Sequence, residues 1–233
     1  MTVRPIPFSD PMIVALREGR KTQTRRMLDL ACDEPPAYVQ DGVVTALNEH
    51  DQEHRWPNTY AVGDHLYVRE TYYQFGHWEP VQGAKTKGGK QKWAFIADRP
   101  DVLFEQPGNC RLGHRYCDPW TPAWHKRLGR FMPKAFSRMT LIVTDVRVQM
   151  LNKISEEDAI AEGVLNSGRR DGEPWDHFSF PGIPSIHEHE ASTCYSLLWE
   201  SITGPGAWEA NPWVTAITFT VHHCNVDQIG EAA

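Results

Sequence analysis

The chain of 233 residues is 40% hydrophobic and 23% charged, which is typical of a globular protein long enough to bury a sizeable core. No apolar run approaches the ~20 residues of a membrane span, and the N-terminus lacks a signal-peptide core, so we expect a cytoplasmic protein with no membrane partner. The formal net charge of -6 argues against nucleic-acid binding over the whole surface, and the five scattered cysteines argue against a disulfide framework.

The first predicted element is a helix over residues 10–18. Asp10 can cap its N-terminus, and Gly19 can end it in a left-handed conformation. Residues 22–28 then alternate as in a strand. Residues 29–62 are rich in Pro, Asp and His, and we predict that they form loops.

The rest of the chain is predicted to consist of short strands with single helices between them. Strands are expected at residues 65–73, 92–97, 138–149 and 213–221, and helices at 155–163 and about 187–202. This order favours a small mixed barrel over a βαβ sheet, so the predicted fold class is α+β, with the four strands closing into one partly open barrel. We expect a single domain over residues 1–225, with a long insert at about 76–130 and a mobile tail over 226–233.

The stretch GRKTQTRR, residues 19–26, holds four basic side chains and no acid within an acidic protein. It is either a solvated basic turn or a site for an anionic or carbonyl-bearing ligand. Lys21 and Thr24 can converge only if the chain is still turning at Lys21, because residues three apart in a strand point to opposite faces. Arg26 would share a strand face with Thr24.

Glu70 lies on an apolar face of the strand predicted at residues 65–73, where an unpaired carboxylate is unfavourable. It forms either a structural salt bridge with a nearby arginine or part of a site at the Lys21 turn. In the second case, Thr24 would be a nucleophile, and Lys21 or Glu70 would move its proton, which suits acyl transfer. We therefore expect Glu70 to be buried and within salt-bridge reach of Lys21 or Arg26.

A second basic stretch contains no acid between Asp118 and Asp145. Basic and aromatic residues alternate along it: Lys126, Arg127, Arg130, Lys134 and Arg138 with Trp120, Trp124, Phe131 and Phe136. This composition suits a surface for a nucleotide or a single-stranded nucleic acid. The alternative is aromatic packing beneath a solvated rim.

Four zinc-type ligands also lie close together in the sequence: Cys110, His114, Cys117 and His125. Their spacing, C-x3-H-x2-C-x7-H, matches no common zinc finger. We therefore expect no metal and no cofactor, with this cluster as the candidate if zinc is found. The chain also lacks a P-loop and the G-x-G-x-x-G, HExxH and G-x-S-x-G motifs.

The run SDPMIVALREGRKTQTRR, residues 9–26, resembles the start of an ASCH domain, a relative of the PUA-like RNA-binding barrels. The family signature G-x-K-x-x-E-x-R reads here as Gly19, Lys21, Thr24 and Arg26, with threonine in place of glutamate. Residues 131–164 and 198–214 also resemble the longer ASCH proteins that are common in phages and prophages. Together these segments cover about half of the chain.

The resemblance implies a PUA-like, partly open barrel with flanking helices. The threonine makes the motif similar to that of small bacterial ASCH amidohydrolases, which deacetylate N4-acetylcytidine with a Lys and a Thr of this motif and a Glu from a later strand. The matching catalytic residues are Lys21, Thr24 and Glu70, and the candidate substrate-binding residues are Arg26, Arg69, Lys134, Ser137 and Arg138.

The function implied is therefore hydrolysis of an N-acylated pyrimidine nucleoside or nucleotide, in the cytoplasm of a bacterial host if the chain is phage-encoded. Three alternatives stay open: a non-catalytic module that binds RNA or a modified base, a metal-independent ribonuclease, and an accessory interaction role in a phage. For the first two, as for the hydrolase, the expected ligand is a nucleoside, a nucleotide or RNA.

Overall fold

The structure is a computed structural model that describes residues 1–28, 36–40, 43–47, 53–57, 60–169, 171–183 and 187–229. The chain divides into two compact units: unit 1 comprises Met1–Ile6, Asp10–Val68 and Arg138–Ala233, and unit 2 comprises Pro7–Ser9 and Arg69–Ser137. The predicted insert at residues 76–130 lies inside unit 2. Among the helices described, none is long and apolar enough to cross a membrane.

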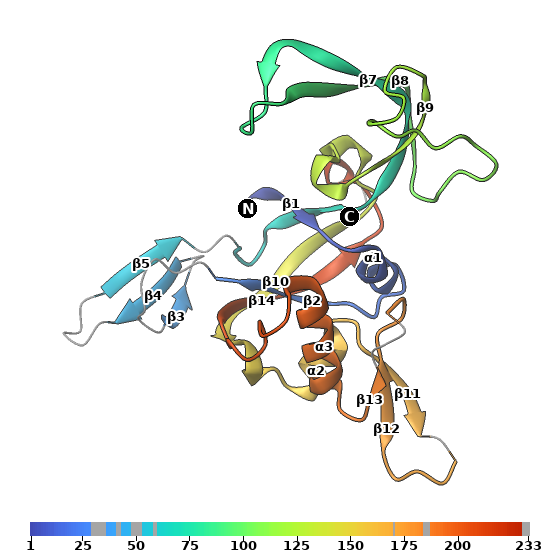
Figure 1. Cartoon of the computed structure of the whole chain (residues 1–233). Helices are drawn as coiled ribbons and strands as arrows, with labels where there is room; N and C mark the ends of the chain where they lie inside the picture. Colours follow the sequence, from blue (N-terminus) through green and yellow to red (C-terminus); the bar gives the residue numbers. More distant parts are fainter. Residues whose placement is uncertain are drawn as a thin grey trace. The chain divides into compact units, whose positions relative to one another are not determined.

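Unit 1 is built on a five-stranded sheet with the strand order β1-β6-β10-β14-β2 (Figure 1). Its strands are β1 (Val3–Pro7), β2 (Gln23–Met27), β6 (His65–Arg69), β10 (Thr140–Met150) and β14 (Trp213–His222). β10 pairs antiparallel with β14 along its length, with a register shift between Val143 and Asp145. β14 then pairs with β2, where Ile217 lies opposite Thr24. The β-branched and aromatic residues of β10 and β14 favour these extended strands.

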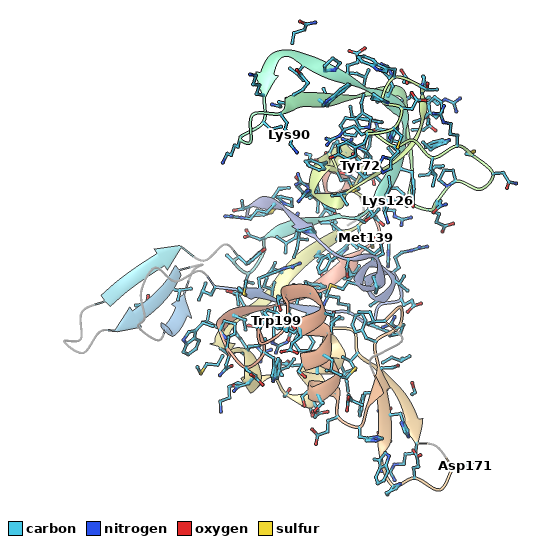
Figure 2. The ribbon with its side chains drawn as sticks, viewed as in Figure 1. Tyr72, Lys90, Lys126, Met139, Asp171 and Trp199 are labelled. Carbon is cyan, nitrogen blue, oxygen red and sulfur yellow. The ribbon has the colours of Figure 1, made fainter. Side chains whose placement is uncertain are left out.

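Helix α3 (Ala191–Thr203) supplies much of the core of unit 1. Its buried side chains, including Tyr195, Leu198 and Trp199, form one stripe along the helix. They belong to the same hydrophobic cluster as Phe180 and Val214, and Figure 2 labels Trp199 on this helix. Complete burial of one such large apolar side chain stabilises the fold by about 1.5–3 kcal/mol.

Local sequence signals set the ends of the two shorter helices. α1 (Asp10–Arg17) is followed by Gly19, which has a φ of 72°, in the left-handed region. α2 (Glu156–Ala161) begins after Ser155, whose hydroxyl accepts a hydrogen bond from the backbone N–H of Asp158. Gly163, with a φ of 107°, follows α2. The predicted helices at 10–18 and 155–163 are thus confirmed.

Two predictions about the first half of the chain are wrong. Residues 29–62, predicted as loops, include a three-stranded antiparallel sheet of β3 (Pro36–Gln40), β4 (Val43–Leu47) and β5 (Glu53–Pro57). The strand predicted at 65–73 is broken at residues 70–71, so that β6 and the following strand belong to different sheets. The first sheet pairs consecutive strands within a segment of turn-favouring composition, whereas the break at 70–71 depends on the distant partners of β6 and β7. Period-two alternation alone encodes neither feature.

Unit 2 contains a separate three-stranded sheet with the order β8-β7-β9. Its strands are β7 (Tyr72–Lys85), β8 (Gln91–Leu103) and β9 (Ala123–Arg127), and Lys90 lies at the tip of the β7–β8 hairpin (Figure 2). The prediction that the strand at 92–97 closes a barrel with those at 65–73, 138–149 and 213–221 is therefore wrong, because β8 pairs with β7. The α+β class is confirmed, and the described sheets are not closed into a barrel.

The remaining elements are short. β11 (Leu165–Arg169), β12 (Asp176–Ser179) and β13 (His187–Glu188) form a small sheet, so the helix predicted from 187 begins only at Ala191. The 3-10 helices are η1 (Gly129–Phe131), η2 (Lys134–Phe136), η3 (Leu151–Lys153) and η4 (Val226–Gln228). Val226 is buried, although residue 226 is where the mobile tail was predicted to begin. Residues 230–233 lie outside the described residues.

Candidate functional site

The turn after α1 carries Lys21 into the interior of unit 1. The backbone N–H groups of Arg20 and Lys21 both donate to the carbonyl of Ala15, at 3.0 and 3.1 Å. The chain is therefore still turning at Lys21, as the sequence pattern requires for a site here. β2 begins two residues later at Gln23, and the Lys21 side chain is completely buried.

The Lys21 amine contacts the carboxylate of Glu162, which was not among the predicted site residues. Its Nζ lies 2.6 Å from Oε2 of Glu162 and also donates to the Glu162 backbone carbonyl at 2.9 Å. Burial lowers the pKa of Lys21 below its usual value of 10.5, because the ammonium loses its hydration. The negative charge of Glu162 acts in the opposite direction but does not reverse the effect, and the positive charges of Arg26 and Arg25 add to it.

Two side chains of β2, those of Gln23 and Arg25, contact carboxylates of α2 and of its C-cap residue Glu162. Arg25 Nη2 lies 2.7 Å from Oδ2 of Asp158, and its Nη1 lies 3.2 Å from Oε1 of Glu162. Gln23 Nε2 donates to Asp158 Oδ1 at 3.0 Å, and the Tyr195 hydroxyl donates to Glu162 Oε1 at 3.4 Å. The two carboxylates are four residues apart, so they share one side of the α2 turn, just as residues two apart share one face of β2. We call these five residues with Lys21 the α2–β2 cluster.

Thr24 is buried, with 2% of its surface exposed. The alternation of β2 places its side chain on the face opposite that of Gln23 and Arg25. Arg26, which is partly exposed, shares this second face. The motif therefore has two sides: one faces the carboxylates of α2, and the other carries the Thr24 hydroxyl.

The other predicted site residues are divided between the units. Arg138 belongs to unit 1, and Glu70, Arg69, Lys134 and Ser137 belong to unit 2. Glu70 is 3% exposed, so its predicted burial is confirmed, but it lies in the break between β6 and β7 and not on a strand face. Its pairing with Lys21 or Arg26 stays a prediction.

The candidate zinc ligands are not brought together. His125 is buried, and its Nδ1 accepts a hydrogen bond from Trp78 Nε1 at 3.3 Å. Gly113 lies so close to the other side of the His125 ring that a Cβ at residue 113 would come within 2.2 Å of Nε2. Cys110 and Cys117 are exposed thiols. Within the described part of the chain, no group of three or more His, Cys, Asp or Glu side chains is arranged to hold a metal.

Asp158 links the α2–β2 cluster to the acid stability of unit 1. Burial opposes its ionisation, but hydrogen bonds from Gln23 and Arg147 and the charges of Arg25 and Arg147 outweigh burial and lower the pKa of Asp158 below 3.8. A carboxyl group whose pKa is lower in the folded than in the unfolded state stabilises the protein above the unfolded pKa. That stabilisation is lost as the pH falls through the folded value.

We expect Asp158→Asn to lower the free energy of unfolding at neutral pH by about 1–3 kcal/mol, because charge-assisted hydrogen bonds are replaced by neutral ones. The variant should also lose less stability than the wild type as the pH falls below 3.8. Urea unfolding over a pH series measures both effects. Asp176→Asn is the matched control, because Asp176 pairs with Arg169 at the surface. A pH dependence of unfolding that is the same in Asp158→Asn and the wild type would contradict this account.

Comparison with known proteins identifies no relative: no family model, curated protein or solved structure matches this chain.

Proposed function

We propose that the chain is an ASCH-type protein with a PUA-like fold, and that it hydrolyses an N-acylated pyrimidine nucleoside or nucleotide of the N4-acetylcytidine type. The observation that carries this proposal is the Lys21 amine, which is completely buried at the motif turn and has a lowered pKa. Lysine becomes a useful general base when burial lowers its pKa, and strongly perturbed pKa values are enriched at functional sites. The resemblance of the surrounding motif supplies the reaction class.

In the proposed reaction, Thr24 is the nucleophile and Lys21 the general base. This step requires the Lys21 amine to leave its Glu162 partner in the deprotonated form and reach the opposite face of β2, where it takes the proton of the Thr24 hydroxyl as Oγ1 attacks the acyl carbon. The bond between the acyl carbon and the exocyclic nitrogen then breaks, and the proton passes to that nitrogen, which leaves as an amine. Water hydrolyses the resulting threonyl ester, releases the acid and restores the hydroxyl.

The resemblance assigns further roles outside this pair. Glu70 is proposed to assist proton transfer and orient the substrate, and Arg26, Arg69, Lys134, Ser137 and Arg138 are proposed to bind it. Because Thr24 is buried, the reaction requires the substrate to gain access to its hydroxyl. Catalytic hydrogen bonds that are long in the free enzyme commonly tighten only when substrate is bound.

The direct test is a turnover assay with purified protein. The substrates are N4-acetylcytidine, its 5′-monophosphate and N4-acetylated single-stranded RNA, and the readout is released acetate. We expect release from at least one acylated substrate, and a preference for the nucleotide would fit the surplus of arginine at the motif. Absence of acetate release from all three would overturn the hydrolase proposal.

The burial of Thr24 favours one second candidate, a non-catalytic module that binds a modified base or RNA at the same motif. Equilibrium dialysis of the same three ligands separates the two proposals. Binding without turnover, weakened by substitutions of Arg26, would support the module, whereas turnover would exclude it.

Glu162 is proposed to act as a positioning residue for Lys21. Its charge raises the pKa of the amine, so Glu162→Gln should lower that pKa further and keep a hydrogen-bonding side chain in place. A general base works in its neutral form, so the acidic limb of the kcat/KM profile should move to lower pH. Glu18→Gln is the control, because Glu18 is an exposed carboxylate near the same turn that pairs with Arg20. An unchanged limb in Glu162→Gln would exclude this role.

A further inference from the structure

Unit 2 differs sharply in charge from the rest of the chain. Residues 69–137 hold 12 Lys and Arg against six Asp and Glu, a formal charge of +6, whereas the whole chain has -6, so the remaining residues carry -12. Such an asymmetry between two parts of a chain is typical of a protein that presents one part to a polyanion. The whole chain is thus acidic, although unit 2 on its own is basic.

One face of the β7–β8–β9 sheet carries aromatic rings with arginines over them. Trp78 of β7 lies opposite Phe95 of β8, with ring centroids 5.3 Å apart. The Arg127 guanidinium lies 4.3 Å from the Phe95 centroid and 4.9 Å from that of Trp78. Arg115, from the loop before β9, lies 5.4 Å from the Trp78 centroid. We call this side the ribbon face.

The ribbon face continues toward the tip of the β7–β8 hairpin with two more indole rings. Trp93 is two residues from Phe95 on β8, so the two share the same face. Trp120 stacks edge-on against Trp93, with centroids 5.5 Å apart. The side chains of β7, β8 and β9 cluster densely in Figure 2, where Lys126 of β9 is labelled.

Two carboxylates of the hairpin, Glu79 and Asp98, lie on the opposite face. His77 precedes Trp78 on β7 and therefore points the other way. It contacts two of the hairpin acids, with Asp98 Oδ2 3.0 Å from its Nδ1 and Glu79 Oε1 3.3 Å from its Nε2. Asp118, in the loop beside Trp120, is paired with Arg111. The ribbon face thus presents positive charge and π surfaces on the side of the sheet away from Glu79 and Asp98.

Three aromatic side chains of unit 2 are largely exposed. Trp120 is 58%, Tyr116 78% and Phe131 57% exposed. Tyr116 and Phe131 each lie beside an arginine guanidinium: Arg115 is 4.5 Å from the Tyr116 centroid, and Arg130 is 5.0 Å from the Phe131 centroid. If packing beneath a solvated rim were their only role, these rings would be covered. Their exposure leaves planar surfaces free for a ligand.

We propose that the ribbon face of unit 2 binds a single-stranded polynucleotide, with Trp120 and Tyr116 stacking on bases and the arginines contacting phosphates. Single-strand surfaces combine a basic track with exposed aromatic rings in this way, because every base has a π face. A duplex hides those faces in its stack, so it would use only the charge. The inference does not rest on the proposed hydrolase, since none of its residues belongs to the Lys21 motif.

The test is fluorescence anisotropy of the full chain with labelled oligonucleotides of about 12 nucleotides, within the usual range of single-strand site sizes. RNA and DNA single strands of one sequence are compared with the RNA duplex over a salt series. We expect the protein to bind the single strands with an affinity that falls steeply as the salt concentration rises, and to bind the duplex more weakly. RNA and DNA share the chemistry that the ribbon face recognises, and the ratio of their affinities identifies the preferred strand.

Substitutions of the exposed aromatic residues then distinguish base stacking from electrostatic attraction to the phosphates. Trp120→Ala and Tyr116→Ala should each raise the dissociation constant for the single strand about 5- to 150-fold, the loss expected for one stacked base. Trp120→Phe should retain more affinity than Trp120→Leu, because only phenylalanine keeps a planar ring. Trp175→Ala is the matched control, since Trp175 is a 46% exposed tryptophan of unit 1 and its loss should change nothing.

Several outcomes would overturn the inference. If Trp120→Ala and Tyr116→Ala bound the single strand as tightly as the wild type, neither ring would stack on a base. If the duplex bound as tightly as the single strand, electrostatic attraction alone would explain the binding. Binding of heparin or of anionic lipid vesicles without binding of either oligonucleotide would assign the face to another polyanion. Because the substituted side chains are exposed, melting temperatures close to that of the wild type are expected and should be measured alongside.

Discussion

Replacing Lys21 by methionine should lower the free energy of unfolding by about 3–5 kcal/mol. The substitution keeps the length and most of the volume of the side chain but leaves the Glu162 carboxylate in the interior without its amine partner. Arg25 and Tyr195 still contact Glu162, so the loss should fall toward the lower end of this range. Urea unfolding followed by tryptophan fluorescence would measure the loss, because Trp199 lies in the core of unit 1.

The double variant Lys21→Met/Glu162→Leu distinguishes a stranded charge from a loss of packing. Removal of both partners of a buried ion pair is commonly close to neutral, so the double variant should regain most of the stability that Lys21→Met loses. Arg169→Met is the control, since it removes an exposed cation whose partner Asp176 remains in water. If Lys21→Met were as stable as the wild type, the buried pair would have no part in holding unit 1 together.

Removal of the Thr24 hydroxyl should abolish most of the proposed hydrolysis. Thr24→Val keeps the shape of this buried side chain, and we expect it to lower turnover of an acylated cytidine by at least about 100- to 10,000-fold. We expect losses of the same size for Lys21→Ala and Glu70→Ala. The three losses should not add, because groups that act as one unit share a single contribution. Thr22→Val, at an exposed threonine of the same turn, is the matched control.

The measurement is single-turnover acetate release, with a thermal melt of each variant to separate chemistry from unfolding. Lys134→Ala and Arg138→Ala should behave differently and raise KM for phosphorylated substrates with little change in kcat, because they are proposed to hold phosphate. Wild-type turnover in a folded Thr24→Val protein would show that Thr24 is not the nucleophile.

Local chemistry made the helices and the motif turn predictable. Ser155 precedes α2 as its cap residue, Asp10 is the acidic first residue of α1, and Gly19 follows α1 in a left-handed conformation. The β-branched residues of β10 and β14 likewise made these two strands predictable. The break at Glu70 was not predictable, because it depends on the distant segments that complete the two sheets, with β10 beside β6 and β9 beside β7; β8, in contrast, pairs with its sequence neighbour β7 in a hairpin.

The partner of Lys21 was missed for a related reason. Glu162 lies 141 residues away in the sequence, and nothing near the motif points to it. One signal was available: Asp158 and Glu162 are four residues apart on a helix with a clear cap, opposite a strand that carries Gln23 and Arg25 at spacing two. Two carboxylates on one helix face need cations, and β2 supplies them.

The way in which the chain enters and leaves unit 2 has a consequence for how such a protein changes over time. The chain leaves unit 1 after Val68, near the end of β6, and returns at Arg138, and the Val68 N–H donates to the Met139 carbonyl at 2.9 Å. The exit and the return are thus neighbours on two antiparallel strands, with Tyr67 opposite Thr140. A tight Asn-Gly turn could join these strands and preserve their register. Insertion, shortening or exchange of the segment at this junction is therefore compatible with an unchanged pairing of β6 with β10.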